Sequence, residues 1–191
     1  MGAVYKLSGG KVFEVSQGSI TKYDAEALVC PANQDLAMLA FLGGIQYAFL
    51  KEAGPEVFAE AGRIAENLGG AIGETSAVLT GAGKLDAKYI IHSVSLGYDE
   101  ITERLYCDGD IIAQSVHNLL DLAEENGITS VGIPALGTGL YGVPLEECVK
   151  ATISQIKPYL KESKSLQKVG LVIHGEEDFH TAKGISDSYF H

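Results

Sequence analysis

The residues best suited to chemistry lie between Pro134 and Pro144, where the chain reads Pro-Ala-Leu-Gly-Thr-Gly-Leu-Tyr-Gly-Val-Pro. An apolar run, Val131–Pro134, precedes them, and a helical pattern opens at Pro144. Glycine lets a backbone turn tightly and approach a ligand closely. Successive backbone N–H groups in such a turn, with the positive end of the following helix, attract an anion. The segment therefore predicts a loop that holds a phosphate group.

The glycines of this segment match the pattern G-x-G-x-x-G between Gly137 and Gly142. A dinucleotide-binding fingerprint of this form follows the first strand of its unit and places its third glycine in the helix. Here the motif lies late in the chain, and Val143-Pro144 separate Gly142 from the helical pattern. The sequence favours a phosphate loop of another type, with a purely structural turn and a dinucleotide site as the alternatives.

Two further segments are candidates for the same ligand. Gly43 and Gly44 open a helical pattern at Ile45, and the first N–H groups of a helix have no partner within it. Asn33 follows a strand-like run and can both donate to and accept from sugar hydroxyls. The alternatives are a plain helix start for the glycines and a turn-closing asparagine.

Composition excludes several classes of function. The net charge is −11, from 14 basic and 25 acidic residues, with no cluster of Lys and Arg such as nucleic-acid backbones require. No stretch approaches the ~20 apolar residues that span a bilayer, and the first residues lack a secretory signal pattern. We therefore expect a globular cytoplasmic protein that binds neither nucleic acid in general nor membranes.

Other reactive side chains fit structural roles better. Cys30, Cys107 and Cys148 are far apart and form no C-x-x-C pair, which is typical of buried thiols in a reducing compartment. His92 ends an apolar run and is expected to be structural. The polar run 174–180 contains residue types that bind metals but lacks a spacing diagnostic of metal ligands, so we expect a loop after an edge strand. The sequence predicts no metal and no cofactor.

The alternation of strand-like and helical patterns predicts a single α/β domain over residues 1–191. The expected strands are Val12–Val15, Ala27–Cys30, Thr75–Leu79, Tyr89–Ser93, Val131–Pro134 and Val169–His174, with Val4–Leu7 as an additional one. The expected helices run from Gly44 to about Leu68 with an interruption at Gly54-Pro55, from Asp110 to Asn126, and from Pro144 to Leu160.

The order of these motifs resembles the macro domain family. The segments that carry the resemblance are Gly18–Thr21, Asp24–Asn33, Gly43–Ile45, Ala87–Val94 and Ile133–Pro144, so it extends over roughly residues 10–180. It implies a three-layer α/β/α fold with a mixed, mostly parallel central sheet. It also implies ADP-ribose or a related metabolite as ligand. Some members only bind it, whereas others hydrolyse ADP-ribosyl esters, O-acetyl-ADP-ribose or ADP-ribose 1''-phosphate.

Carried over position by position, the resemblance implies a set of ligand contacts. They are Ser19 and Ile20 beside the adenine, Ala32 and Asn33 along the distal ribose, Gly43, Gly44 and Ile45 at the pyrophosphate and distal ribose, Gly137, Thr138, Gly139, Leu140 and Tyr141 around the phosphates, and Phe179 over the adenine face. For Phe179 a place in the core is the alternative.

The chain departs from the family pattern at several of these positions. Ser19 stands where the family usually has an aspartate that accepts from the adenine amino group, and a neutral acceptor makes a weaker contact. The family's Asn-Ala-Ala-Asn becomes Cys30–Asn33, and Leu42 replaces the first of three glycines after an unusually apolar stretch, 35–41. Gln46 stands where one subgroup of hydrolases has an aspartate, and it cannot act as a base.

Three hypotheses follow. The first is an ADP-ribose-binding domain that hydrolyses an ADP-ribosyl linkage or ADP-ribose 1''-phosphate, with Asn33 as the candidate catalytic residue and water as the nucleophile. The second is a reader that binds ADP-ribose without catalysis, and the third is a nicotinamide-dependent oxidoreductase. The expected partner is free ADP-ribose or an ADP-ribosylated protein, and the sequence leaves the oligomeric state open.

Overall fold

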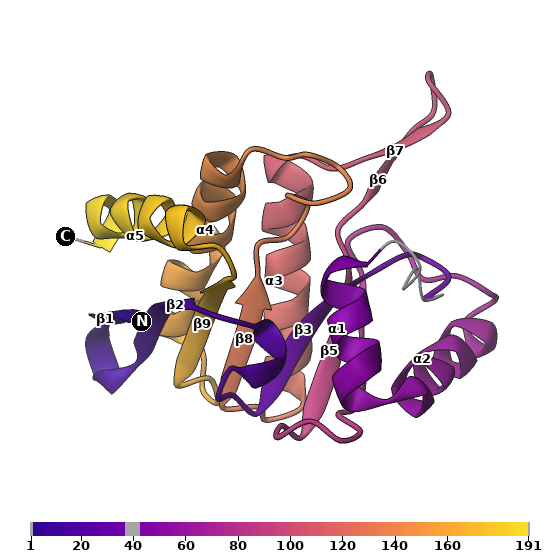
Figure 1. Ribbon diagram of the computed structural model, residues 1–191, viewed down its shortest axis with the longest axis horizontal. Coiled ribbons are helices and arrows are strands. Elements are labelled where there is room, and N and C mark those ends of the chain that lie inside the picture. Colours follow the sequence, from indigo (N-terminus) through magenta and orange to yellow (C-terminus); the bar gives the residue numbers. More distant parts are fainter. Residues whose placement is uncertain (1, 37–42, 191) are drawn as a thin grey trace.

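A computed structural model describes residues 2–36 and 43–190 of the chain, and Figure 1 shows its layered arrangement around a central sheet. In the described part, seven strands pair in the order β1-β2-β9-β8-β3-β5-β4. The bounds are Gly2–Lys6 for β1, Val12–Gln17 for β2, Ala27–Ala32 for β3, Ala77–Gly81 for β4, Tyr89–Val94 for β5, Ser130–Pro134 for β8 and Lys168–Ile173 for β9.

The five inner strands are parallel, and the two edge strands, β1 and β4, are antiparallel to their neighbours. This arrangement confirms the expected mixed, mostly parallel sheet. The inner strands are buried on both faces because helices cover both, and successive residues of a strand point to opposite sides. Ala27 and Val29 of β3 belong to one core cluster, whereas Leu28 and Cys30 belong to another.

Helices cover both faces of the sheet and complete three layers (Figure 1). One face carries α3 (Gly109–Glu125), α4 (Leu145–Glu162) and α5 (Glu176–Phe190). The other carries α1 (Gly44–Ala53), α2 (Pro55–Asn67) and η2, a 3₁₀ turn over Ile20–Lys22. The expected break between the first two helices is confirmed at Gly54, whose φ of 102° a glycine adopts without strain.

Two expectations about the C-terminal part were wrong. The strand predicted at Val169–His174 is β9, and it lies between β2 and β8 rather than at an edge. The polar run after it is the start of α5 and not a loop. Three acidic side chains occupy the first turn of this helix, where the positive end of the helix dipole favours them. A smaller correction concerns Pro144, which is the N-cap of α4 and not its first helical residue.

The sequence patterns gave no sign of a short hairpin between β5 and α3. Its strands are β6 (Gly97–Asp99) and β7 (Arg104–Tyr106), which pair only with each other. Figure 1 shows this hairpin projecting from the body of the molecule. Strands of three residues with mixed polarity carry no readable periodicity, because period-2 alternation needs at least four positions to be recognised.

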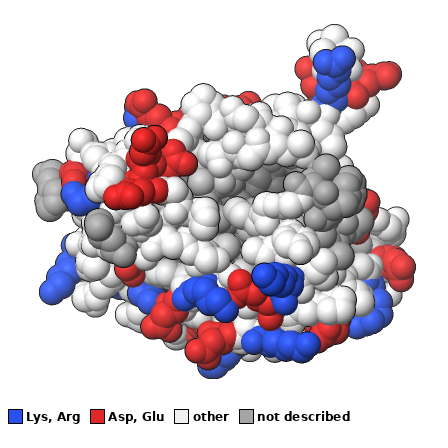
Figure 2. Space-filling view, in the orientation of Figure 1, with Lys and Arg blue, Asp and Glu red and all other residues white. Residues whose placement is uncertain are grey.

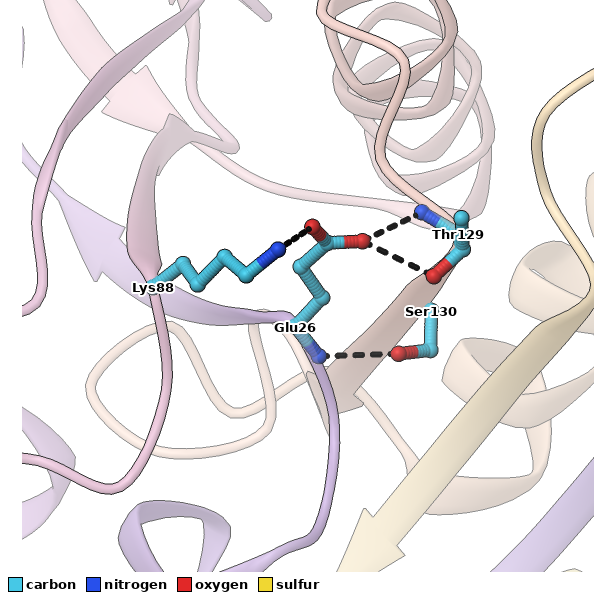
Figure 3. A network of polar contacts seen from close by, with 4 residues as sticks. All are labelled: Glu26, Lys88, Thr129 and Ser130. Carbon is cyan, nitrogen blue, oxygen red and sulfur yellow. Dashed lines mark hydrogen bonds and ion pairs between the residues drawn. The ribbon is translucent and has the colours of Figure 1, made fainter.

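Glu26 ties together the amino ends of three strands (Figure 3). Its Oε1 accepts from Lys88 Nζ at 2.8 Å, and its Oε2 accepts from the N–H and the hydroxyl of Thr129, both at 2.8 Å. The N–H of Glu26 donates to Ser130 Oγ at 2.8 Å. Hydrogen bonds from Lys88 and Thr129 lower the pKa of the Glu26 carboxyl to about 2. The strand β3 is thus fixed to β5 on one side and to β8 on the other.

At the opposite, carboxyl end the same strands part. The strand β3 pairs with β5 at six positions, but it pairs with β8 only at Ala27↔Val131 and Leu28↔Gly132. Beyond these two pairs no further ladder joins β3 to β8 within the described residues. The sheet therefore opens between them on the side where Ala32 and Pro134 end their strands.

Replacing Glu26 with glutamine should lower the free energy of unfolding by about 1–2 kcal/mol at neutral pH, because the ion pair with Lys88 and a charge-assisted bond from Thr129 are lost. The wild-type advantage should be constant above pH 4.5, the ordinary pKa of a glutamate, and should disappear as the pH falls toward 2. The sign follows from a folded-state pKa that is below the unfolded one. Urea unfolding of both proteins at several pH values checks this, and an advantage that does not change with pH would contradict it.

Candidate functional site

A cleft of about 560 Å³ lies at the carboxyl ends of β8 and β9. Its lining comes from four separate regions of the chain, which are Gly18–Ile20, then Gly44, Ile45 and Ala48, then Pro134, Ala135, Thr138 and Leu145, and finally Val172–Gly175 with Asp178. Figure 2 shows that this side of the molecule is hollowed across its middle, where the visible surface is nearly free of charged side chains. No Lys or Arg is among the described residues that line the cleft.

The chain connections explain why a cleft forms here. From β3 the chain proceeds through α1 and α2 toward β5, whereas from β8 it proceeds through α4 to β9, in the opposite direction across the sheet. Two adjacent parallel strands whose connections diverge leave a crevice at their carboxyl ends, and ligands of open α/β sheets bind in that crevice.

The glycine-rich loop after β8 is held in a fixed shape. Gly137 has a φ of +74°, and a Cβ at this position would lie 2.7 Å from Cys107 Sγ, so only glycine fits. Val143 N–H donates to Gly137 O at 3.1 Å, and Thr138 Oγ1 donates to Ala135 O at 3.0 Å. The backbone N–H groups of residues 138–141 donate to no other residue in the described part of the chain. They are therefore available to an anion.

Helix N-termini add positive partial charge to the cleft. The helix α1 begins with Gly43 as N-cap and Gly44, at φ values of +74° and +72°, and no side chain caps it. The helix α4 begins after Pro144, again without a side-chain cap, and its first residue, Leu145, lines the cleft. Uncapped first-turn N–H groups bind anions without a formal charge on the protein.

The structure brings five of the sequence-predicted ligand residues together in the lining: Ser19, Ile20, Gly44, Ile45 and Thr138. Gly43 is adjacent to Gly44, and Gly137, Gly139, Leu140 and Tyr141 belong to the same loop as Thr138. Ala32 and Tyr141 pack against a core cluster under α2. Asn33 follows β3 and accepts a hydrogen bond from Leu36 N–H on its carbonyl oxygen. Leu42 and the stretch 37–41 lie outside the described residues.

Phe179 lies in the core and is not among the cleft-lining residues. Its side chain is 1% exposed and belongs to the cluster under α3, α4 and α5. Phe179, Ala182 and Ser186 are the buried residues of α5. They are three and four positions apart, so they lie on one face of the helix, and this face packs against the sheet. The ring therefore offers no open face to a ligand. This supports the alternative from the sequence analysis, in which Phe179 is a core residue.

Among the lining residues that sequence reasoning missed are two with ionisable side chains, His174 and Asp178, because it placed them in a polar loop after an edge strand. Asp178 is the only carboxylate among the described lining residues, and a Cβ on Gly175 would lie 3.5 Å from its Oδ2. Nearby, Ser19 Oγ already pairs with Thr21 Oγ1 at 2.8 Å. The acidic group on this side of the cleft is thus at position 178 and not at 19.

Comparison with known proteins agrees with this architecture. A family model described as the macro domain matches residues 29–152. The chain belongs to the macro domain family.

Relatives of this macro domain match over nearly their full length. An uncharacterised protein of Sulfolobus acidocaldarius is 31% identical, over 98% of this chain and 97% of its own. A protein of Pantoea vagans named O-acetyl-ADP-ribose deacetylase 1 is 33% identical, over 88% of this chain and 95% of its own. The solved Oceanobacillus iheyensis macrodomain with ADP superposes with a TM-score of 0.86 at 22% identity, covering 99% of this chain and 96% of that one. These findings confirm the three-layer α/β/α fold.

Two side chains of this macro domain that could act as a nucleophile or a base, Cys30 and His92, are buried and poorly suited to either role. Cys30 is fully buried, and burial raises the pKa of its thiol far above the usual range. Burial lowers the pKa of His92 to about 4, and its Nε2 shares a hydrogen bond with Thr80 Oγ1 at 2.9 Å. The side-chain N–H₂ of Gln46 donates to Pro31 O at 2.9 Å. Neither Cys30 nor His92 is equipped to start a reaction at neutral pH.

Three further observations concern possible metal sites, a second depression and membrane-spanning helices. Within the described residues no three His, Cys, Asp or Glu side chains lie together in a way that suits a metal ion. A second depression of about 540 Å³ between α3 and α4 is lined by Asp110, Glu146 and Glu147 with one cation, Lys150, and this acidic lining repels anions. Among the described residues we also find no helix with the length and apolar character needed to cross a membrane.

Proposed function

We propose that this macro domain binds ADP-ribose in the cleft at the ends of β8 and β9. The observation that carries the proposal is the set of backbone N–H groups at residues 138–141 without a partner in the described chain. Thr138 of this set lines the same cleft as the uncapped start of α1, and no described lining residue is a Lys or Arg. A pyrophosphate suits two opposed groups of amide donors. The names of solved relatives support this ligand, since one is a Trypanosoma brucei macrodomain in complex with ADP-ribose (22% identity, TM-score 0.77, covering 91% of this chain and 68% of that one).

The charges of the cleft orient the ligand. The phosphates belong at the glycine-rich loop and the start of α1, where the backbone donors are, and away from the carboxylate of Asp178. The adenine then lies near Ser19, Ile20 and Asp178. Its exocyclic amino group is a donor that a carboxylate accepts strongly, whereas the hydroxyl of Ser19 is already paired with Thr21. Asp178 thereby takes the role that the aspartate at position 19 has elsewhere in the family.

Calorimetric titration should detect ADP-ribose binding to the wild-type protein and none to Gly139→Glu, because a carboxylate placed among the amide donors repels the pyrophosphate. Nothing lies within 4 Å of a Cβ on Gly139, so the substitution fits without disturbing the fold. Gly184→Glu is the matched control. It introduces the same charge at an equally open glycine in α5, outside the cleft, and should bind like the wild type. Absence of binding by the wild-type protein would refute the proposal.

Asp178→Asn should reduce the preference for ADP-ribose over its inosine analogue, in which a carbonyl oxygen replaces the amino group. A charge-assisted bond contributes about 1.5–3 kcal/mol, so the wild type should prefer ADP-ribose at least about tenfold. An asparagine can donate to the carbonyl and accept from the amino group, so the ratio should approach one. Glu176→Gln removes the same charge from the first turn of α5 outside the lining and should keep the preference. An unchanged ratio in Asp178→Asn would remove this residue from adenine recognition.

A second function, hydrolysis of an acyl ester of ADP-ribose, is favoured by the relative named O-acetyl-ADP-ribose deacetylase. The thiol of Cys30, on the strand that leads to Asn33, is buried and has a raised pKa, so we take water as the attacking group. Water adds to the acyl carbonyl, the bond from the acyl carbon to the ribose oxygen breaks, and the water proton reaches that oxygen. A phosphate oxygen of the substrate, which the glycine-rich loop holds near the water, accepts the proton of the water and passes it on. Asn33 orients the distal ribose.

Asn33→Ala should lower the rate of acetate release from O-acetyl-ADP-ribose about 10²-fold or more, because a mispositioned ribose misaligns the ester and the water. The dissociation constant for ADP-ribose should change much less, since the amide donors of the loop are intact. Acetate release is measured in parallel with titration, and Gly139→Glu sets the background rate. Wild-type release equal to that background would leave a reader without catalysis, and unchanged release in Asn33→Ala would remove Asn33 from the reaction.

A further inference from the structure

The hairpin β6–β7, residues 97–106, is an arm with an apolar surface and no partner in the described chain. Tyr98 and Leu105 are opposite each other on one face and are 47% and 44% exposed, and Ile101 at the tip is 94% exposed. Neither strand pairs with the central sheet. A two-stranded hairpin is marginally stable alone, so exposed apolar side chains on one are costly unless something covers them.

The arm is nevertheless a built structure. At its tip the Oδ1 of Asp99 accepts from the N–H groups of Ile101 at 2.8 Å and Thr102 at 3.1 Å, which fixes the turn. At its base the ring of Tyr106 lies over Gly97, where a Cβ would come within 2.7 Å of the ring. The face with Tyr98 and Leu105 is therefore presented outward in a defined orientation.

The base of the arm adjoins the glycine-rich loop of the cleft. Cys107, directly after β7, has its Sγ 2.7 Å from the position that a Cβ of Gly137 would take. Leu96, directly before β6, belongs to the core cluster against which Tyr141 packs. The arm thus rises beside the glycine-rich loop, where the proposed function places the phosphates. In the orientation proposed above, the distal ribose lies on this side.

The charges of the arm select the partner. Asp99, Glu100 and Glu103 surround a single cation, Arg104, and Figure 2 shows red atoms on both sides of a blue group on the projecting hairpin. The whole chain carries a net charge of −11. Two copies meeting through their arms would bring like charges together, which is unfavourable. An apolar face beside carboxylates fits a basic segment with apolar side chains.

We infer that the arm docks a basic segment of the protein to which the ADP-ribose is attached, and that this domain therefore recognises ADP-ribosylated proteins in preference to the free metabolite. The inference rests on the proposed function. The distal ribose carries the protein in such a substrate, and the arm stands where that protein emerges from the cleft. The apolar contact with Tyr98, Ile101 and Leu105 supplies area, and the carboxylates supply charge complementarity.

The experiment compares three probes by titration: free ADP-ribose, a Lys/Arg-rich peptide bearing ADP-ribose through a non-hydrolysable link, and an Asp/Glu-rich peptide bearing the same group. The wild type should bind the basic conjugate at least about tenfold more tightly than free ADP-ribose and the acidic conjugate no more tightly. The triple variant Tyr98→Ser, Ile101→Ser, Leu105→Ser and the variant Glu100→Lys, Glu103→Lys should both lose this gain while binding free ADP-ribose as before. Leu68→Ser, at a side chain 61% exposed just beyond α2, is the matched control and should keep it.

The possible results separate the two proposals. Wild-type protein that fails to bind free ADP-ribose refutes the proposed function, and with it the role of the arm. Normal binding of free ADP-ribose with equal affinity for all three probes, or a gain that survives in both arm variants, overturns the inference about the arm alone. Light scattering that shows a dimer in the wild type and a monomer in the triple variant also overturns it, because the arm would then bind a second copy.

Discussion

The hydrogen bonds and ion pair of Glu26 are the constraint on which the cleft at the other end of the sheet depends. They fix β3 to β5 and β8 at their amino ends, and the pairing of β3 with β8 ends after two residues. Strands that are pinned at one end and unpaired at the other diverge along their length. The loops that follow them are thereby separated, and the space between holds the start of α1 on one side and the glycine-rich loop on the other. The shape of the cleft thus depends on contacts at the opposite, amino ends of the strands.

An acidic protein can have a cleft that is suited to an anion. At physiological salt, charges more than about 8 Å apart are largely screened, so the net charge of −11 contributes little inside a recessed site. What matters there is the local set of dipoles, and these are backbone N–H groups and helix ends. The absence of Lys and Arg from the described lining also limits non-specific attraction of other polyanions. In the proposed function, selectivity depends on the shape of the cleft and on the position of Asp178, the one carboxylate among its described lining residues.

Much of this architecture could be predicted from the sequence because it is encoded locally. Apolar runs bounded by turn residues gave the inner strands, and the succession from Val131 through Gly137 to Pro144 gave the loop that lines the cleft. The place of Asp178 at the cleft was not predicted, and that of Phe179 in the core was only one of two alternatives, because both depend on which face α5 turns to the sheet. The hairpin was missed for a different reason, since its strands are too short to show a period. Asn33 and the glycine-loop contacts remain predictions until a ligand is measured.

The donors of the glycine-rich loop are main-chain atoms, and this has a consequence for how the site can change over generations. A substitution at Thr138, Leu140 or Tyr141 by any residue except proline changes a side chain but keeps the backbone N–H group, so heritable variation there changes the surroundings of the site and leaves the donors in place. Gly137 is the exception, because its backbone angle and the nearby sulfur of Cys107 leave no room for a side chain. The loop therefore combines one position that resists mutation with several that are open to selection, a combination that lets one scaffold acquire new ligands.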